Sequence, residues 1–306
     1  MTLKIHLDTD IGGDTDDLCA LALLLASPEV ELVGITTCAD AEGRRKTFAE
    51  HALKLAGRTG IPVATGARGF LGGLEHFPGV QDVRYWPGAV QVEPGPAREG
   101  LDLLEASARS GATIVAVGPF TNLAMLESLR PGVFAHAPVV VMGGYLGLPP
   151  AGYPQWPSSY DYNVQADRVA ARIVYEKLDP LIASLNVTLK SSLRRRDLAV
   201  LKAGGPLARL MALQAELHCE NNRMEKLARD NLALPSDLLN FQYDSVACAA
   251  AIGLDSITTG VERRALDVDG EQLVLRERDD APERRFVVDV DTDEFSRTWL
   301  ERVSAL

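Results

Sequence analysis

The chain has 306 residues, of which 46% are hydrophobic and 24% charged, and a formal net charge of −11 at pH 7. This length suffices for one large α/β domain with a sizeable core, and the acidic balance argues against nucleic acid or an anionic membrane as the main partner. The four cysteines show no metal-ligand spacing. We see no signal peptide and no apolar run near the roughly 20 residues that span a bilayer. We therefore expect a cytoplasmic protein with no membrane partner.

Apolar stretches of strand length alternate with amphipathic helices as far as residue 184. Strands are expected at 3–7, 30–36, 63–65, 113–117, 139–142 and 181–184, and helices at 17–26, 44–56, 98–110, 122–129 and 167–176. This alternation predicts a Rossmann-like, mostly parallel sheet flanked by helices in an α/β fold. Loops at 66–96 and 143–159 are long enough to form lids or substrate walls, or else surface excursions.

The alternation ends beyond Pro180. Helices near 196–202 and 206–230 predict an α-rich insertion, and residues 261–290 predict a C-terminal β-meander with Asp269-Gly270 as a hairpin turn. A helix at 293–303 closes the chain. We expect residues 1–306 to form a single catalytic domain.

The most informative segment is 8–17, DTDIGGDTDD, which follows the first expected strand and precedes an apolar helix. Its five carboxylates would repel one another at the end of a sheet unless a cation or several hydrogen-bond donors offset their charge. Oxygen ligands on a turn suit calcium or magnesium better than zinc. An acidic helix N-terminus explains Asp16 and Asp17, but not Asp8 and Asp10. We therefore expect a metal site where open α/β sheets bind ligands, at the carboxyl ends of strands.

Three further segments carry motifs of their own. They are 117–124 (VGPFTNLA), 141–144 (VMGG) followed by 161–163 (DYN), and 243–245 (YDS). Together with 8–17, and in this order and spacing, they resemble the nucleoside hydrolase family of the inosine/uridine-preferring type. The family's motifs read DxDxG…DD, GPLTNLA, MGG…EFN and HDP, so the first motif here carries two additional residues before its final pair. The resemblance implies a calcium-dependent enzyme that cleaves the N-glycosidic bond of ribonucleosides.

The resemblance also implies a role for individual residues. The Ca²⁺ ligands would be Asp10, Asp17, the carbonyl of Val117 and Asp244. Asp10 would also be the general base. The substrate-binding residues would be Asp16, Asn163, Asp161, Asp40 and Met142, with Asp161 in place of a glutamate near the ribose 5′ end. Asp8 is expected to orient the turn, and Asp14, in the two-residue extension, receives no role.

The implied chemistry is coherent. Breaking a ribosyl C–N bond develops positive charge at the anomeric carbon, which nearby carboxylates stabilise. Calcium would hold the 2′ and 3′ hydroxyls and orient the attacking water, and Asp10 would take that water's proton. The substrate would be a small nucleoside, and the resemblance further implies a homodimer or homotetramer.

Three departures from the family motifs concern the nucleobase and ribose contacts. Tyr243 stands where the family has histidine, and a tyrosine pKa of about 10, against about 6.5, matches proton transfer at neutral pH less well. Tyr243 is therefore either the leaving-group acid or a wall of the base pocket, and His76 is the one candidate replacement. Where the family has a ribose-binding asparagine, this chain has Asp40 followed by Ala41. Asn186 replaces a more usual aspartate.

Other functions remain open at this point. A haloacid-dehalogenase-like phosphatase also begins with DxD after a strand, but Gly12, Gly13 and further aspartates follow here. The spacing excludes an EF-hand loop. A riboside-binding protein without turnover, or a hydrolase of a modified N-riboside, would retain the same residues. Aromatic residues that could stack on a base are Tyr145, Tyr153, Trp156 and Phe241.

Overall fold

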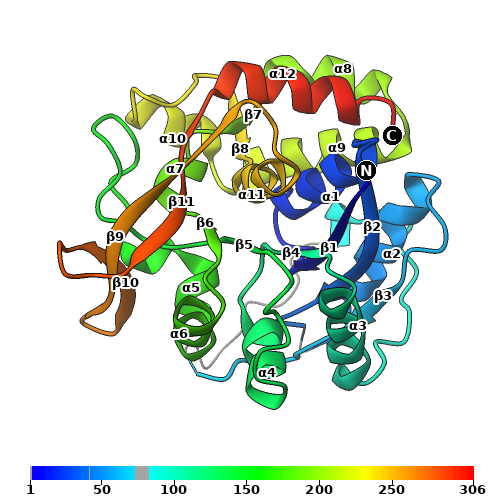
Figure 1. Ribbon diagram of the computed structural model, residues 1–306. Coiled ribbons are helices and arrows are strands. Elements are labelled where there is room, and N and C mark those ends of the chain that lie inside the picture. Colours follow the sequence, from blue (N-terminus) through cyan, green and yellow to red (C-terminus); the bar gives the residue numbers. More distant parts are fainter. Residues whose placement is uncertain (1, 41, 73–82) are drawn as a thin grey trace.

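The computed structural model describes residues 2–40, 42–72 and 83–306, and a nine-stranded sheet crosses its centre (Figure 1). The strand order is β10-β9-β11-β6-β5-β4-β1-β2-β3. The strands are β1 (Leu3–Thr9), β2 (Val30–Thr37), β3 (Val63–Thr65), β4 (Thr113–Ala116), β5 (Val139–Met142), β6 (Leu181–Ala183), β9 (Ile257–Asp269), β10 (Gln272–Glu277) and β11 (Glu283–Val290). All neighbouring pairs from β11 to β3 are parallel, whereas β9 runs antiparallel to both β10 and β11.

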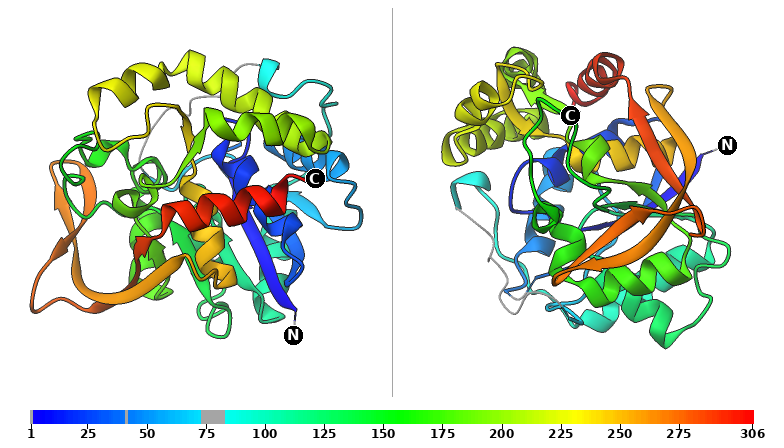
Figure 2. Two further views of the ribbon diagram at one scale, coloured as in Figure 1. Left: turned by 90° about the horizontal axis from the view of Figure 1, so that it is seen from above. Right: turned by 90° about the vertical axis from the view of Figure 1, so that its left-hand side faces the viewer.

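Helices cover both faces of this sheet, as Figures 1 and 2 show. They are α1 (Asp16–Ala26), α2 (Arg45–Leu55), α3 (Ala97–Arg109), α4 (Thr121–Leu129), α5 (Tyr162–Ala166), α6 (Arg168–Lys177), α7 (Leu185–Thr188), α8 (Leu198–Ala203), α9 (Pro206–Asn221), α10 (Met224–Asp230), α11 (Tyr243–Ile252) and α12 (Thr292–Val303). Helices α3, α4 and α6 lie on one face, and α1, α11 and α12 lie on the other. The predicted mostly parallel α/β architecture is confirmed.

The first part of the chain follows the sequence-based prediction closely. Each of the six strands and five helices expected before residue 185 is present, with ends within two residues of those predicted. The parallel strands are buried on both faces, so their apolar runs are easy to recognise. A separate two-stranded sheet of β7 (Ser192–Arg194) and β8 (Leu238–Phe241) was not predicted, because three or four residues carry little pattern.

The second part of the chain needs three corrections. The helix predicted over 206–230 is two helices, because Arg223 adopts a left-handed conformation with φ of 53° and ends α9. The hairpin turn is Gly270-Glu271 rather than Asp269-Gly270, since Asp269 pairs with Gln272. The three C-terminal strands are antiparallel as expected, but β9 rather than β10 lies in the middle and β11 joins the main sheet.

Within its described residues, 66–72 and 83–96, the first long loop contributes side chains to the core. Tyr85 and Trp86 are buried, and Trp86 stacks on Phe48 with ring centroids 4.5 Å apart. His76, the histidine considered as a replacement for the family residue, lies outside the described residues. In the part of the chain that is described, no helix is long and apolar enough to cross a membrane.

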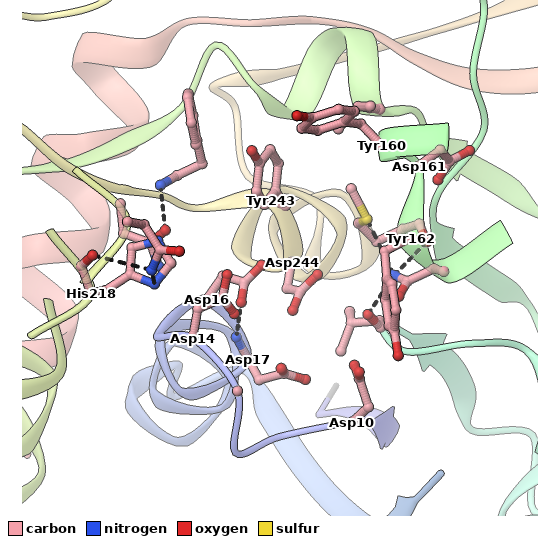
Figure 3. A pocket seen from close by; sticks show the side chains of 18 of the residues that line it. Asp10, Asp14, Asp16, Asp17, Tyr160, Asp161, Tyr162, His218, Tyr243 and Asp244 are labelled. Atoms are coloured by element: carbon pink, nitrogen blue, oxygen red, sulfur yellow. Dashed lines mark hydrogen bonds between the residues drawn. The ribbon is translucent and has the colours of Figure 1, made fainter. Parts of the chain in front are cut away.

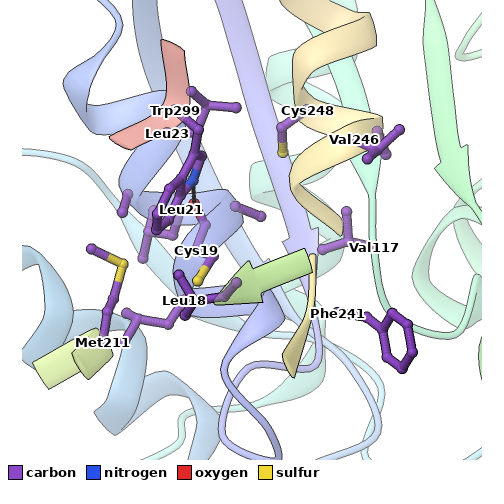
Figure 4. Packing of buried hydrophobic residues seen from close by; sticks show 14 of the residues in the cluster. Leu18, Cys19, Leu21, Leu23, Val117, Met211, Phe241, Val246, Cys248 and Trp299 are labelled. Atoms are coloured by element: carbon purple, nitrogen blue, oxygen red, sulfur yellow. Dashed lines mark hydrogen bonds between the residues drawn. The ribbon is translucent and has the colours of Figure 1, made fainter. Parts of the chain in front are cut away.

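The C-terminal helix α12 holds the helix that begins with Asp16 and Asp17. Trp299 is 1% exposed, and its indole Nε1 donates a hydrogen bond of 3.1 Å to the carbonyl of Cys19 on α1 (Figure 4). Burial of an indole that also satisfies its one polar atom fixes both the position and the orientation of a helix. The last helix therefore sets the position of the first.

We expect Trp299→Ala to lower the free energy of unfolding by about 3–5 kcal/mol, the usual cost of emptying a buried aromatic site. Chemical denaturation followed by circular dichroism would measure it. Leu232→Ala, at a side chain that is 93% exposed, serves as control and should change stability by less than about 0.5 kcal/mol. Equal stabilities of the two variants would contradict this account of α12.

Candidate active site

A cavity of about 590 Å³ opens at the carboxyl ends of β1, β4 and β5, which are neighbours in the sheet. Acidic residues gather at its base and aromatic residues on its wall (Figure 3). The lining residues are Asp10, Gly13, Asp14, Asp16, Asp17, Arg45, Val117, Met142, Trp156, Tyr160, Asp161, Tyr162, Asn163, Leu185, His218, Asn222, Met224, Leu227, Asn240, Phe241, Tyr243 and Asp244. Of the catalytic, substrate-binding and metal-binding residues that the sequence predicts, only Asp40 is missing from this lining, and of the aromatic residues that could stack on a base, Tyr145 and Tyr153 are missing.

The 8–17 turn places its carboxylates by local hydrogen bonds. The hydroxyl of Thr9 donates to the carboxylate of Asp17 and accepts from the backbone N–H of Ile11. Asp16 and Asp17 then begin α1, where the helix dipole favours negative charge. Gly118 lets the end of β4 approach, because a Cβ there would lie 2.9 Å from both the backbone nitrogen and Oδ1 of Asp10.

Asp8 lies beneath the cavity and ties the strands together. Its Oδ1 accepts hydrogen bonds from the hydroxyl of Thr36 on β2 and, at 2.7 Å, from Nδ2 of Asn122 on α4. Asn122 also donates to the carbonyl of Thr37 and accepts from the backbone N–H of Ala67. The asparagine of the VGPFTNLA segment thus joins the ends of β1, β2 and β3, which holds Asp10 in place.

Asn163 and Asp161 form the opposite side of the cavity. Nδ2 of Asn163 donates to the carbonyls of Val117 at 2.7 Å and Met142 at 3.1 Å. Oδ2 of Asp161 accepts from the backbone N–H of Gly144 at 2.8 Å, whereas its buried Oδ1 has no hydrogen-bond partner among the described residues. The 117–124 segment therefore meets the 141–144 and 161–163 segments here, because β4 and β5 are neighbours in the sheet.

Asp40, predicted to bind substrate, is buried elsewhere. Its two carboxylate oxygens accept the backbone N–H groups of Arg44 at 2.8 Å and Arg45 at 2.9 Å, at the start of α2. Arg45 in turn reaches the cavity, where its guanidinium lies 3.7 Å from a carboxylate oxygen of Asp10. The structure thus gives Asp40 the task of fixing the backbone at Arg45, because unsatisfied N–H groups at a helix start need an acceptor.

The carboxylates of the cavity floor are buried together. Burial raises the pKa values of Asp16, Asp17 and Asp244 well above the usual range, and the neighbouring carboxylates raise them further. Burial also raises the pKa of Asp10, while the positive charge of Arg45 opposes that shift. So much like charge in one place favours binding of a cation or of protons.

The donor set fits a hard divalent cation. Within the described residues, carboxylate oxygens of Asp14, Asp16 and Asp17 all lie within 4.8 Å of one another. Asp17 belongs both to this cluster and to the ligand set that the resemblance implies. Oxygen-only ligands suit a calcium or magnesium ion, whose positive charge would offset the repulsion between these carboxylates and favour their ionised form.

Aromatic side chains form the wall above the acids. Tyr243 stacks on Phe241 with centroids 5.1 Å apart, and Trp156 stacks on Tyr160 at 5.0 Å. Burial, followed by the charges of three nearby aspartates, raises the pKa of Tyr243 well above its usual value, so its hydroxyl keeps its proton. Among the other aromatic candidates, Tyr145 does not line the cavity, and its hydroxyl donates to the carbonyl of Trp156.

His218 lines the cavity and was not predicted. It lies on α9, which the sequence places in the α-rich insertion, and its side chain is mostly buried. Helical periodicity identifies α9 as a helix but does not say which turn of it meets the acidic turn at 8–17. The alignment of this helix with the cavity is a tertiary property that no local motif reveals.

We expect the metal-free protein to lose stability as the pH rises from about 4 to about 7. Burial raises the pKa of Asp161 to about 7, against about 3.9 for a free aspartate, so the folded state binds this proton more tightly than the unfolded state. The resulting stability is present at low pH and is lost as the pH rises toward the folded pKa. Thermal unfolding at several pH values would show a shallower decline for Asp161→Asn. Asp293→Asn, at an exposed side chain, should decline as wild type does; identical slopes for all three proteins would refute the assignment.

Comparison with known proteins agrees with the site. Residues 5–297 match the family model described as inosine-uridine preferring nucleoside hydrolase. The pyrimidine-specific ribonucleoside hydrolase RihA of Salmonella paratyphi A is 33% identical over 238 residues, 74% of each chain, and that of Salmonella arizonae is 30% identical over an aligned length of 322, covering 99% of each. A plant nucleoside hydrolase structure superposes with a TM-score of 0.81 at 22% identity over the full length of both chains. A purine-preferring ribonucleoside hydrolase from Gardnerella vaginalis gives 0.74 at 21%, covering 98% of each. The chain therefore belongs to the nucleoside hydrolase family.

Proposed function

We propose that this protein hydrolyses the N-glycosidic bond of ribonucleosides and releases ribose and a free nucleobase. The observation that carries the proposal is the cavity itself. It has buried carboxylates on its floor, an amide and a carboxylate on one side, and aromatic rings on its wall. A ribonucleoside has groups that match these three surfaces: the 2′ and 3′ hydroxyls of the ribose ring, the 5′ hydroxyl and a flat base.

The ribose would lie over the acidic floor. We propose Asp16 and Asn163 as the residues that would hydrogen-bond its 2′ and 3′ hydroxyls. Met142 packs beside Asn163, with its sulfur 3.4 Å from Nδ2. The unpartnered Oδ1 of Asp161 is the acceptor available near the 5′ end. Because every hydroxyl would meet a fixed polar group, the anomeric carbon would be held in one position for attack.

We propose Ca²⁺ as the cofactor, with Asp10, Asp17, the carbonyl of Val117 and Asp244 as the residues that would hold it. The carbonyl of Val117 already accepts the Asn163 amide, and a carbonyl oxygen has a second lone pair to offer. When bound, the ion would supply the positive charge that orients the ribose hydroxyls and makes a water easier to deprotonate. Burial of these side chains keeps competing water away from the reacting atoms.

Asp10 is the proposed general base. It stands at the end of β1 on a turn fixed by Asp8 and Asn122, and it takes the proton of the attacking water. Arg45, 3.7 Å away, favours the ionised form of Asp10 that this task requires. Asp16 and Asp244 add negative charge close to the carbon that becomes positive as the C–N bond lengthens, which lowers the barrier electrostatically.

Tyr243 is proposed to act on the leaving base. Its stacking on Phe241 presents an aromatic surface to the base plane. Since its pKa is raised by burial and by neighbouring acids, the hydroxyl serves as a hydrogen-bond donor that retains its proton. We further propose that residues 1–306 act as one catalytic domain in a cytoplasmic homodimer or homotetramer that supplies bases for nucleoside salvage.

Release of reducing sugar from a panel of purine and pyrimidine ribonucleosides, with and without chelator, tests the function. Ribose release that calcium restores after chelation supports it, and the best substrate names the base class. Thermal stabilisation by a nucleoside with no sugar released would instead indicate a riboside-binding protein. Cleavage of modified N-ribosides alone would indicate a different natural substrate.

We expect Asp10→Asn to lower kcat by roughly 10³-fold, within the range for loss of a general base. The same variant should unfold at a higher temperature than wild type without metal, because one buried like charge is removed. Steady-state kinetics and thermal unfolding measure the two effects. Asp293→Asn is the control for both, and an Asp10→Asn enzyme within about tenfold of wild type would contradict the role.

We expect calcium to raise the unfolding temperature of the metal-free protein, since a ligand present at 100 times its Kd stabilises the folded state by about 2.7 kcal/mol. Asp244→Asn should shift this response to higher calcium concentrations. Calorimetric titration with calcium and with magnesium measures the affinities independently of activity. A calcium affinity unchanged by Asp244→Asn would remove Asp244 from the ligand set.

A further inference from the structure

His218 and Asn222 form a pair one helical turn apart that lines the cavity at the end of α9. Figure 3 shows His218 across the cavity from Asp161 and Tyr162, with the acidic floor between them. His218 is 9% exposed. The roles proposed above for the floor, the 5′ side and the aromatic wall leave this pair without one.

The contacts of Asn222 fix the position of the histidine proton. The side-chain nitrogen Nδ2 of Asn222 lies 3.2 Å from the backbone carbonyl oxygen of His218 and 3.2 Å from its ring Nδ1. A carbonyl oxygen only accepts, so the amide nitrogen must be the group that faces it, and an amide nitrogen only donates. Nδ1 is therefore the acceptor, and in the neutral ring the proton sits on Nε2.

Nε2 is the nitrogen left for a ligand. Within the described part of the chain it has no protein hydrogen-bond partner, while Nδ1 is occupied by Asn222. Burial lowers the pKa of His218, and the charge of Asp14 opposes that shift. A ring that stays neutral keeps a single N–H donor at this end of the cavity.

The geometry of a ribonucleoside brings its base to this end. In the ring, the 2′ and 3′ hydroxyls lie on the edge opposite the ring oxygen, and C1′ and C4′ flank that oxygen on opposite sides. If the hydroxyls face the acidic floor and the 5′ end faces Asp161, the base attached to C1′ must point away from Asp161. His218 lies in that direction.

We propose that His218 donates a hydrogen bond from Nε2 to an acceptor atom of the leaving nucleobase, and that Asn222 fixes the tautomer that makes this possible. The proposal rests on the proposed function and deepens it, because it names a second group that acts on the base. His218 comes from a different helix than Tyr243. It supplies an imidazole to a pocket whose usual histidine position holds a tyrosine.

The step balances without transfer of the histidine proton. The C1′–N bond breaks and its electron pair goes to the base, while the water oxygen bonds to C1′ and its proton goes to Asp10. The negative charge spreads over the ring nitrogens and carbonyl oxygens of the base. The hydrogen bond that Nε2–H donates to one of these atoms therefore strengthens. After release, the base takes a proton from solvent.

Kinetics of His218→Phe on two leaving groups test the proposal. The first substrate is the best ribonucleoside of the panel, and the second is 4-nitrophenyl β-D-ribofuranoside, whose nitrophenolate leaves as an anion without help. We expect kcat for the nucleoside to fall about 100-fold, the size found when one donor to a developing anion is removed. KM should change little, because the bond strengthens only in the transition state. The nitrophenyl riboside should react within about threefold of wild type.

Two further variants control for shape and for the substitution itself. His218→Gln keeps an N–H donor and should recover at least about tenfold of the lost nucleoside kcat. His136→Phe makes the same change at an exposed histidine away from the cavity and should leave both activities unchanged. Equal losses on both substrates, or no loss on the nucleoside, would overturn the proposal while leaving the hydrolase intact. A wild-type protein inactive on both substrates would overturn the proposed function and this inference together.

Nitrogen NMR of the wild-type protein provides a readout that does not depend on activity. With ¹⁵N-labelled histidine, the signals of His218 should show a protonated Nε2 and an unprotonated Nδ1 at neutral pH. Assignment of the signals comes from comparison with His218→Gln. A proton on Nδ1 would overturn the assigned tautomer, and the proposal with it.

Discussion

The structure depends on the gathering of several carboxylates in one buried place. Asp10, Asp16, Asp17 and Asp244 would repel one another at close range in a weakly screened interior. The parallel sheet brings them together because the carboxyl ends of its strands open at one edge. The fold thus gathers negative charge that a bound divalent cation would offset. In the proposed reaction, the same charge would stabilise the carbon that becomes positive.

The surrounding polar groups keep this repulsion from distorting the backbone. Asp8 and Asn122 bind the ends of three strands, and Asp40 fixes the start of α2 so that Arg45 reaches Asp10. None of the three needs to contact the substrate. Their hydrogen bonds are buried, where an unmade bond would cost about 1–3 kcal/mol. Loss of any one of them would loosen the position of the floor before it altered its chemistry.

What the sequence reveals follows from how local each feature is. The 8–17 run, the buried strands and the VGPFTNLA segment are recognisable from residues close together in the sequence. The sequence therefore predicted that Asp10, Asp17 and Val117 lie at one site, and all three line the cavity. Asp40 was misplaced because its carboxylate has a second use, at a helix N-terminus, that sequence alone does not distinguish from ribose binding. His218 could not be found, because the rotation of α9 about its axis depends on packing against distant elements.

The contact between Trp299 and Cys19 has a consequence for the order in which the protein matures. The acidic turn at 8–17 leaves the ribosome before Asp244 on α11 and the indole of Trp299 on α12. Until they arrive, the carboxylates remain in water and cost nothing to ionise. Binding of the proposed metal ion would therefore follow synthesis of α11 and α12, because a nascent fragment that contains only the acidic motif lacks the Asp244 ligand.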